Sequence, residues 1–229
     1  MAAPPVPFDR SVTAEAFLRG DADRLRAGPT RGCVARLSDL SVSLGVRDDP
    51  AGPAARRAAA LGLPVLRRTT GGRGLLHRPG DLAWSIVLSR GDPRVGRDFP
   101  RAFDRLGSAV VEALAESGLR AAWRPGAGDS SAYCLLDGTA PVLGVGDRIV
   151  GGAAQHATAT ALLHHGVVAL TADPASVARL FDVPLPVAVD RLGGLAERGA
   201  SVDPDALGER LARALGRFLD AGSWDAPVG

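Results

Sequence analysis

A series of strand-like segments in the first half of the chain is joined by short links, and this limits the fold more than any other feature. Two short strands lie within residues 34–44, and further strand-like runs follow at 63–68, 74–77 and 82–88. In the run LSVSL, Leu40, Val42 and Leu44 alternate with serines, which is the period of a strand with one buried face. Parallel neighbours need a connection of about a dozen residues or more. The sequence therefore predicts an α/β fold of the α+β type, in which helices pack on a mixed, largely antiparallel central sheet.

The clearest helix is expected at residues 100–117. Apolar residues such as Phe103, Leu106 and Val110 recur there at three- and four-residue spacing, and Gly118 follows the last of them, as at many helix ends. Further helices are expected at residues 13–27, 54–61, 174–181 and 205–219. Pro184 and Pro186 are expected to break the chain between the last two helices. Three more strands are expected at residues 119–123, 149–154 and 166–170.

The size of the chain is that of one domain. It has 229 residues, of which 46% are hydrophobic, so residues 1–229 are expected to form a single domain with a substantial core. Aromatic residues make up only 4%, so this core must consist largely of leucine, valine and alanine. Residues 124–147 are rich in glycine, serine and aspartate, and the stretch is long enough to predict a functional loop or lid.

All 27 basic residues are arginine, and the chain has no lysine. It can therefore hold no Schiff-base lysine, lysine general base or P-loop lysine. The formal charge of +2 is weaker than that of typical nucleic-acid-binding modules, so no nucleic acid partner is expected. No apolar run approaches the roughly 20 residues that span a bilayer, and the N-terminus lacks the apolar segment of a secretory signal. No membrane partner and a cytoplasmic location are therefore expected.

A glycine turn with three arginines follows the strand-like run that ends near residue 66. Arg67, Arg68 and Arg73 surround the pair Gly71 and Gly72, and His77 comes four residues later. Glycines let the backbone approach a ligand closely, and guanidinium groups match carboxylate or phosphate oxygens. The segment predicts an anion-binding site in a pocket. The alternative is a hairpin whose arginines are simply solvated.

A second segment, DRIVGGAAQ, places small residues in a strand. Gly151, Gly152 and Ala153 mark a place where a ligand or another backbone lies close. Close packing between layers of the fold would explain them equally well. Gln155 is the only glutamine in the chain, which makes it a further candidate for the site.

Two histidines and two cysteines complete the chemically capable residues. His164 and His165 are adjacent on a predicted strand and should face opposite sides, so they do not suit one metal ion, and no metal site is expected. Cys134 lies in the predicted loop and is a candidate nucleophile, although a lone cysteine is often only a small buried hydrophobe. Cys33, in a predicted strand, is expected in the core.

In this order the segments resemble the biotin/lipoate protein ligase superfamily, in particular its lipoate-protein ligase and octanoyltransferase branch. The resemblance is carried by LSVSLG, RRTTGGRGLLH, GDLAWS, DRIVGGAAQ and HHG, and it covers residues 30–180, with the helices at 174–219 completing the domain. It implies a fold like that of biotin ligases and class II synthetases, with a tunnel for a medium-length acyl chain. The implied activity is transfer of a lipoyl or octanoyl group to a lysine of a lipoyl-domain or acyl-carrier protein. The donor would be either an acylated carrier or free lipoate or octanoate with ATP and magnesium.

The resemblance also implies roles for particular residues. The acyl and phosphate site would be lined by Arg68, Gly71, Gly72 and His77, and its opposite wall by Gly151, Gly152 and Ala153. Further substrate contacts are expected from Arg67, Arg73, Gln155 and His165. The predicted catalytic residues are Arg148, which stands where the family has a lysine, and Cys134, because one kind of octanoyltransferase uses an upstream cysteine.

Arg148 is bulkier than the family's lysine, and its guanidinium is planar. The chain could therefore instead be a catalytically silent member that binds the acyl group or the carrier. A ligase with biotin as cargo is a third reading, which the glycine-arginine segment disfavours.

Overall fold

The computed structural model describes residues 5–28, 31–94, 96, 98–126, 131–198 and 202–221. A seven-stranded sheet has the order β1-β2-β6-β10-β9-β8-β7, and a three-stranded sheet has the order β4-β3-β5. The strands are β1 (Phe8–Val12), β2 (Arg31–Leu37), β3 (Ser41–Leu44), β4 (Val65–Arg67), β5 (Leu75–His77), β6 (Leu82–Ser89), β7 (Ala121–Arg124), β8 (Val142–Val145), β9 (Arg148–Ala157) and β10 (Ala161–Val168). In the large sheet β1 and β2 run parallel, and the other neighbours are antiparallel.

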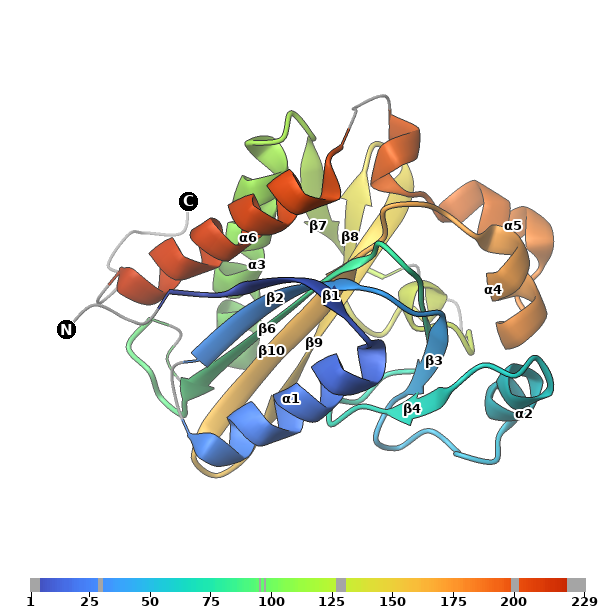
Figure 1. Ribbon diagram of the computed structural model, residues 1–229, viewed down its shortest axis with the longest axis horizontal. Coiled ribbons are helices and arrows are strands. Elements are labelled where there is room, and N and C mark those ends of the chain that lie inside the picture. The colour runs from blue at the N-terminus through green and yellow to red at the C-terminus, as the bar shows by residue number, and fades with distance from the viewer. Residues whose placement is uncertain are drawn as a thin grey trace.

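Helices cover both faces of the large sheet (Figure 1). The helices are α1 (Ala14–Ala27), α2 (Pro53–Ala60), α3 (Phe99–Ala115), α4 (Pro174–Phe181), α5 (Leu185–Arg191) and α6 (Pro204–Asp220), with short 3₁₀ turns η1 (Cys134–Leu136) and η2 (Leu195–Arg198). α3 and α6 pack on one face and α1 packs on the other, while α2, α4 and α5 lie near the small sheet.

The core follows from the alternation of side chains along the central strands. In β6, Trp84 and Ile86 are fully buried in the large apolar cluster under α3 and α6. Ala83, which precedes Trp84, packs on the opposite side with α1. Successive side chains of a strand point to opposite faces, so one strand supplies two apolar layers. This arrangement confirms the predicted mixed sheet with helices packed on it.

β1 and α5 differ from the sequence prediction. β1 was not expected; it is a parallel edge strand that α1 connects to β2, with mostly exposed residues. α5 forms where Pro184 and Pro186 were expected to break the chain, because Pro184 caps the helix and Pro186 lies in its first turn. Proline is tolerated there, since the first helical N–H groups have no intrahelical acceptor.

The glycine turn does not close a hairpin. β4 pairs with β3 in parallel, and β5 pairs with the other edge of β3 in antiparallel. The turn after Arg67 therefore crosses the end of β3 before the chain returns as β5. The hairpin alternative is wrong for this segment.

Of the predicted functional loop at 124–147, residues 127–130 lie outside the described residues, and the remainder contains η1 and β8. Among the helices described, none is long and apolar enough to cross a membrane.

Candidate functional site

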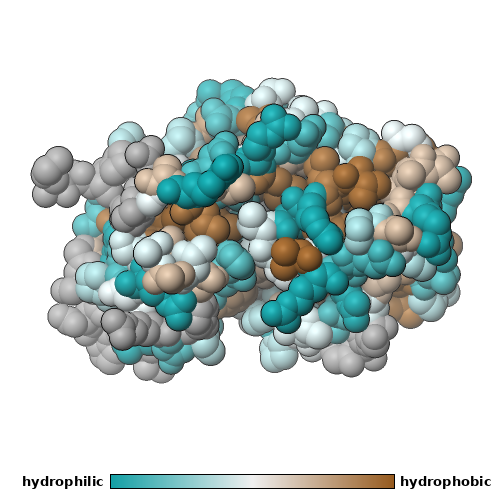
Figure 2. All heavy atoms as spheres, turned by 90° about the horizontal axis from the view of Figure 1, so that it is seen from below, coloured by the Kyte–Doolittle hydropathy of each residue, from teal (hydrophilic) through white to brown (hydrophobic). Residues whose placement is uncertain are grey.

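A pocket that is partly open to solvent lies between α1, the small sheet and strands β9 and β10. Most of its lining is apolar, including Phe17, Leu75, Leu135, Val142 and Val167, and the polar groups are Arg68, His77, Cys134 and His165. On the outer surface viewed in Figure 2, hydrophilic side chains divide the apolar surface into separate patches. The pocket is therefore suited to a hydrocarbon chain that carries one polar end.

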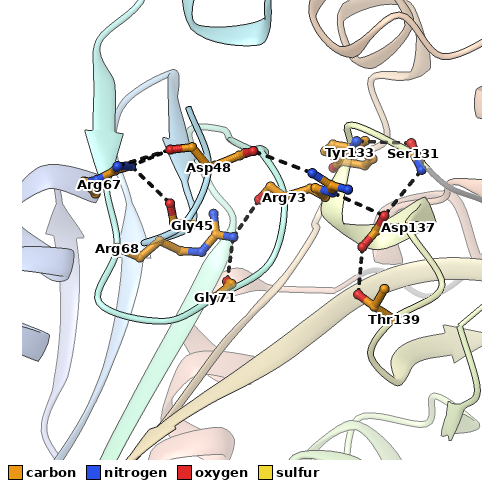
Figure 3. Close-up of polar contacts among 10 residues, drawn as sticks. All are labelled: Gly45, Asp48, Arg67, Arg68, Gly71, Arg73, Ser131, Tyr133, Asp137 and Thr139. Atoms are coloured by element: carbon orange, nitrogen blue, oxygen red, sulfur yellow. Dashed lines mark hydrogen bonds and ion pairs between the residues drawn. The ribbon is translucent and has the colours of Figure 1, made fainter. Parts of the chain in front are cut away.

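Arg68 holds the glycine turn in place (Figure 3). Its guanidinium is buried and donates to the Ser43 carbonyl and hydroxyl oxygens, both at 3.0 Å, and to the Gly71 and Arg73 carbonyl oxygens at 3.1 and 2.6 Å. A planar guanidinium can serve several acceptors at fixed angles. The donors that sequence analysis assigned to a ligand anion are thus directed at the protein's own turn.

The two other arginines of the segment connect neighbouring loops. Arg67 donates to the Gly45 and Asp48 carbonyl oxygens at 3.2 and 2.9 Å. Arg73 is half exposed and lies 3.9 Å from an Asp48 carboxylate oxygen and 3.5 Å from one of Asp137 (Figure 3). Long, exposed ion pairs contribute little stability. Arg73 is therefore the arginine of this group that is most easily redirected to a ligand.

Gly72 needs its lack of a side chain. Its φ is +90°, and a Cβ there would lie 3.0 Å from the Cys134 sulfur and 3.1 Å from the Arg68 Nη2. Such backbone angles favour glycine. Gly72 thus allows the turn to pack directly against Cys134 and Arg68.

His77 presents an unused nitrogen. Its Nε2 lies 2.8 Å from the Ser43 hydroxyl, and its Nδ1 has no hydrogen-bond partner within the described structure. Burial, and then the positive charge of Arg68, lowers the pKa of His77 to about 3. The ring is therefore neutral and contributes to the pocket lining.

The two cysteines lie in contrasting surroundings. Cys134 begins η1, lines the pocket and interacts electrostatically with the Arg68 guanidinium. Cys33 is buried behind α1, and burial raises its pKa to about 12. Since the thiolate is the reactive form, Cys134 is the cysteine suited to chemistry and Cys33 belongs to the core.

The glycines of β9 have separate roles. A Cβ on Gly151 would overlap the Val167 carbonyl oxygen on β10, whereas one on Gly152 would lie 2.7 Å from the tip of Leu135 in the pocket. Gly151 thus permits close strand packing, and Gly152 leaves space in the pocket. Ala153 also lines it.

His164 and His165 face opposite sides of the sheet, as predicted from their adjacency. His165 lines the pocket. His164 packs against Phe103 and Trp84 on the other side, and its Nδ1 lies 3.3 Å from the Gln155 side-chain nitrogen. Burial lowers the pKa of His164 to about 3. Gln155 is therefore placed with His164 and does not line the pocket.

Arg148 does not line the pocket. Its guanidinium donates to the Val189 carbonyl oxygen of α5 and lies 3.7 Å from the Asp147 carboxylate. The next residue, Ile149, is buried among apolar side chains. Residues 148 and 149 therefore place no positive charge in the pocket lining.

Sequence analysis missed two residues that contact His165. Asp21 of α1 lies 2.6 Å from its Nδ1, and the Thr70 hydroxyl lies 2.8 Å from its Nε2. Asp21 is four residues after Phe17, on the apolar face of α1, and a carboxylate on such a face was the available signal. Among the residues that the structure describes, no three His, Cys, Asp or Glu side chains gather as a metal site.

Comparisons with known proteins place these features in context. The profile of the family "Lipoyl protein ligase A/B catalytic domain" matches residues 36–215. A solved structure of lipoate-protein ligase A bound with ATP has a TM-score of 0.74 at 22% identity, over 96% of this chain and 86% of that one. A bipartite lipoate protein ligase from Thermoplasma acidophilum, solved in a study with its E2 lipoyl domain, has a TM-score of 0.71 at 21% identity, over 94% of this chain and 83% of that one. LipL1 of P. falciparum in complex with lipoate has a TM-score of 0.70 at 13% identity, over 98% of this chain and 65% of that one. No curated protein matches the chain by sequence.

Proposed function

The chain belongs to the lipoyl protein ligase A/B catalytic-domain family, and from this premise we propose that it transfers a lipoyl or octanoyl group to a lysine of a lipoyl-carrier protein. The observation that carries the proposal is the apolar pocket in which Cys134, His77 and His165 supply the reactive and polar atoms. The resemblance to this family that the sequence motifs predicted is confirmed. The solved structures of similar fold include one studied together with a lipoyl domain.

The pocket lining supports an acyl cargo. Burial of each methylene group contributes about 0.8 kcal/mol, so the hydrocarbon part of an octanoyl chain would contribute roughly 5 kcal/mol. The chain would lie against Phe17, Leu135 and Val142, with its carbonyl carbon near Cys134. Gly152 keeps room for it on the β9 side.

Cys134 would act as the nucleophile. Its sulfur attacks the acyl carbonyl of a carrier thioester. A new S–C bond forms at Cys134, the donor's S–C bond breaks, and the proton of the Cys134 thiol passes to the donor thiolate. The acceptor lysine then attacks, so that an amide N–C bond forms and the Cys134 thiol is restored.

The arginine contacts favour a carrier-bound donor over ATP. The donors of Arg68 are directed at the turn, and those of Arg67 are directed at the neighbouring loop. Neither guanidinium would be free to hold a triphosphate without releasing these contacts. A thioester donor would not require Arg67 or Arg68 to release these contacts.

The role predicted for Arg148 stays a prediction. To polarise the acyl carbonyl, its guanidinium would have to leave Val189 and Asp147. This contact favours a second candidate function, in which the protein binds the acyl group or the carrier without transferring it.

Intact mass spectrometry separates the two. The protein is incubated with an apo lipoyl domain and either octanoyl-carrier protein or lipoate, ATP and magnesium. An acceptor that gains one acyl group supports the transferase, and loss of that gain in Cys134→Ser supports the assigned nucleophile. An unmodified acceptor in both mixtures contradicts the transferase. Octanoate binding without transfer, together with activity created by Arg148→Lys, would establish the silent binding protein.

A further inference from the structure

Three buried side chains from distant parts of the sequence form one hydrogen-bonded chain. Asp21 of α1 contacts the His165 Nδ1 at 2.6 Å, and the Thr70 hydroxyl contacts the His165 Nε2 at 2.8 Å. All three side chains are buried. Buried polar groups destabilise a fold unless they are paired. The hydrogen-bonded series of Asp21, His165 and Thr70 is therefore an integral part of the fold.

The contacts determine where the protons lie. Burial opposes ionisation of Asp21, but its interactions with His165 and with the Arg24 charge prevail and lower its pKa, and the Arg24 Nη2 donates to its Oδ1 at 2.8 Å. A carboxylate only accepts hydrogen bonds, so the His165 Nδ1 must carry a proton. In the neutral ring Nε2 is then the acceptor, and the Thr70 hydroxyl donates to it.

Other polar and titratable groups near Asp21, His165 and Thr70 do not alter the proton positions assigned to these three side chains. On β6, Ser85 lies opposite His165 in the strand register. Cys33 on β2 remains a thiol, because burial raises its pKa to about 12. His77 on β5 remains neutral, because burial lowers its pKa to about 3.

The exposure of the three groups separates their roles. His165 lines the pocket, whereas Thr70 is fully buried and does not contribute to the lining. A carboxylate, an imidazole and a hydroxyl in this order occur in hydrolases whose hydroxyl is the nucleophile. Here the hydroxyl cannot meet a substrate, and the imidazole can.

We propose that Asp21 is a positioning residue that fixes His165 in its Nδ1-protonated form, so that the His165 Nε2 serves as the proton acceptor during acyl transfer. This inference rests on the proposed function. As the acceptor lysine's N–C bond forms, its N–H bond breaks and the proton moves to Nε2, once the Thr70 hydroxyl turns aside. The Asp21 carboxylate balances the charge of the imidazolium. The proton then passes to the Cys134 sulfur as its S–C bond breaks.

The tautomer is measured directly, without activity, by nitrogen NMR of protein labelled at its four histidines, with His165 assigned from His165→Gln. The wild-type protein should show a proton on Nδ1 of His165, and a proton found only on Nε2 would overturn the proposal. In Asp21→Asn the amide oxygen should remain with Arg24, so the amide NH₂ faces Nδ1 and the proton moves to Nε2. The control Asp23→Asn alters an exposed carboxylate of the same helix that pairs with Arg26, and it should leave the spectrum unchanged.

Kinetics test the catalytic half of the proposal. Asp21→Asn should lower kcat for transfer to a lipoyl domain about a hundredfold, with little change in KM for the acyl donor, and should shift the acidic limb of the pH–rate profile. Asp23→Asn should behave as the wild type. Equal rates for the two variants would refute the role of Asp21. If the wild type transfers nothing, the proposed function fails, and the NMR result still decides whether Asp21 positions His165.

Discussion

The carbonyl oxygen of Gly72 lies so close to Gly45 that a Cβ at position 45 would overlap it. Gly45 directly follows β3, and the turn that contains Gly72 crosses close to it. Two backbone hydrogen bonds fix this crossing: Arg68 N–H to the Leu44 carbonyl at 3.0 Å, and Val46 N–H to the Thr70 carbonyl at 2.8 Å. The residue after β3 is thus part of the pocket's construction even though it does not line the pocket.

Replacing Gly45 with alanine should therefore displace the turn. The new methyl group meets backbone, which cannot rotate away as a side chain can, so we expect a loss of about 2 kcal/mol or more in the free energy of unfolding. Urea denaturation measures this loss. Gly216→Ala in α6 is the matched control, because nothing lies within 4 Å of the new Cβ; alanine should raise stability there by up to about 1 kcal/mol. Equal stability of the two variants would contradict the crossing.

The neighbouring glycines of β9 should respond in opposite ways to alanine. A methyl group on Gly151 would meet the Val167 backbone, so this variant should fold poorly. One on Gly152 would meet only the flexible end of Leu135, so that variant should fold and have a smaller pocket. Gly152→Ala should then favour hexanoyl over octanoyl donors relative to the wild type. Melting temperatures and a series of acyl lengths measure both effects, and an unchanged length preference in folded Gly152→Ala would count against the assigned tunnel.

Acid should destabilise the fold through two buried histidines. His77 and His164 have pKa values of about 3 in the folded protein against about 6.5 when unfolded. The unfolded chain therefore binds more protons below pH 6.5, and each histidine removes up to about 1.4 kcal/mol per pH unit between pH 6.5 and 3. Asp81 acts in the opposite sense, because burial raises its pKa to about 6, and its protonation in the folded state adds stability as the pH falls from 6 to 3.8.

The net effect between pH 6 and 4 is a loss of about 1.4 kcal/mol per unit, since two histidines oppose one aspartate. Urea titrations at pH 7, 6, 5 and 4 test this slope. A folded variant that lacks one of the histidines, such as His164→Asn, should lose most of the net slope. A wild-type stability that stays constant or rises toward pH 4 would show that the signs are wrong.

Alkylation should distinguish the two cysteines. Iodoacetamide is expected to modify Cys134, which lines the pocket, and to spare Cys33, whose thiol is buried and whose pKa is raised to about 12. Octanoate should slow the reaction if the acyl chain occupies the pocket. Peptide mass mapping identifies the modified residue, and Cys134→Ser supplies the control that removes the reaction. Faster modification of Cys33 than of Cys134 would contradict the assignment.

Much of the fold could be predicted because the apolar pattern of the central strands and long helices directly reflects burial. Both faces of β6 are buried, Trp84 and Ile86 on one side and Ala83 on the other, so the strand is visible in the sequence as a nearly continuous apolar run at 82–88. β1 was missed because an exposed edge strand has no apolar pattern to detect. α5 was missed because proline was interpreted as a break, although its position in a first helical turn makes it compatible with a helix.

The site was harder to predict because residue type does not reveal a side chain's partner. The arginines beside the glycine pair were interpreted as ligand groups, yet Arg68 satisfies carbonyl oxygens that a tight turn leaves without N–H donors. Gln155 attracted attention as a rare residue and contacts His164 on the opposite face. Asp21 and Thr70 are distant from His165 in sequence, so only the folded chain brings them together.

β4 and β5 are both attached to β3, one along each edge, so the loop between them is anchored at its two ends to a single strand. It cannot swing open as a hinged flap would without breaking ladder hydrogen bonds on one side. Accommodation of ligands of different size should therefore come from the other walls of the pocket, which include η1 and the small-residue stretch of β9. Sequence changes that retune cargo size in relatives should accumulate on that side and leave the loop unchanged.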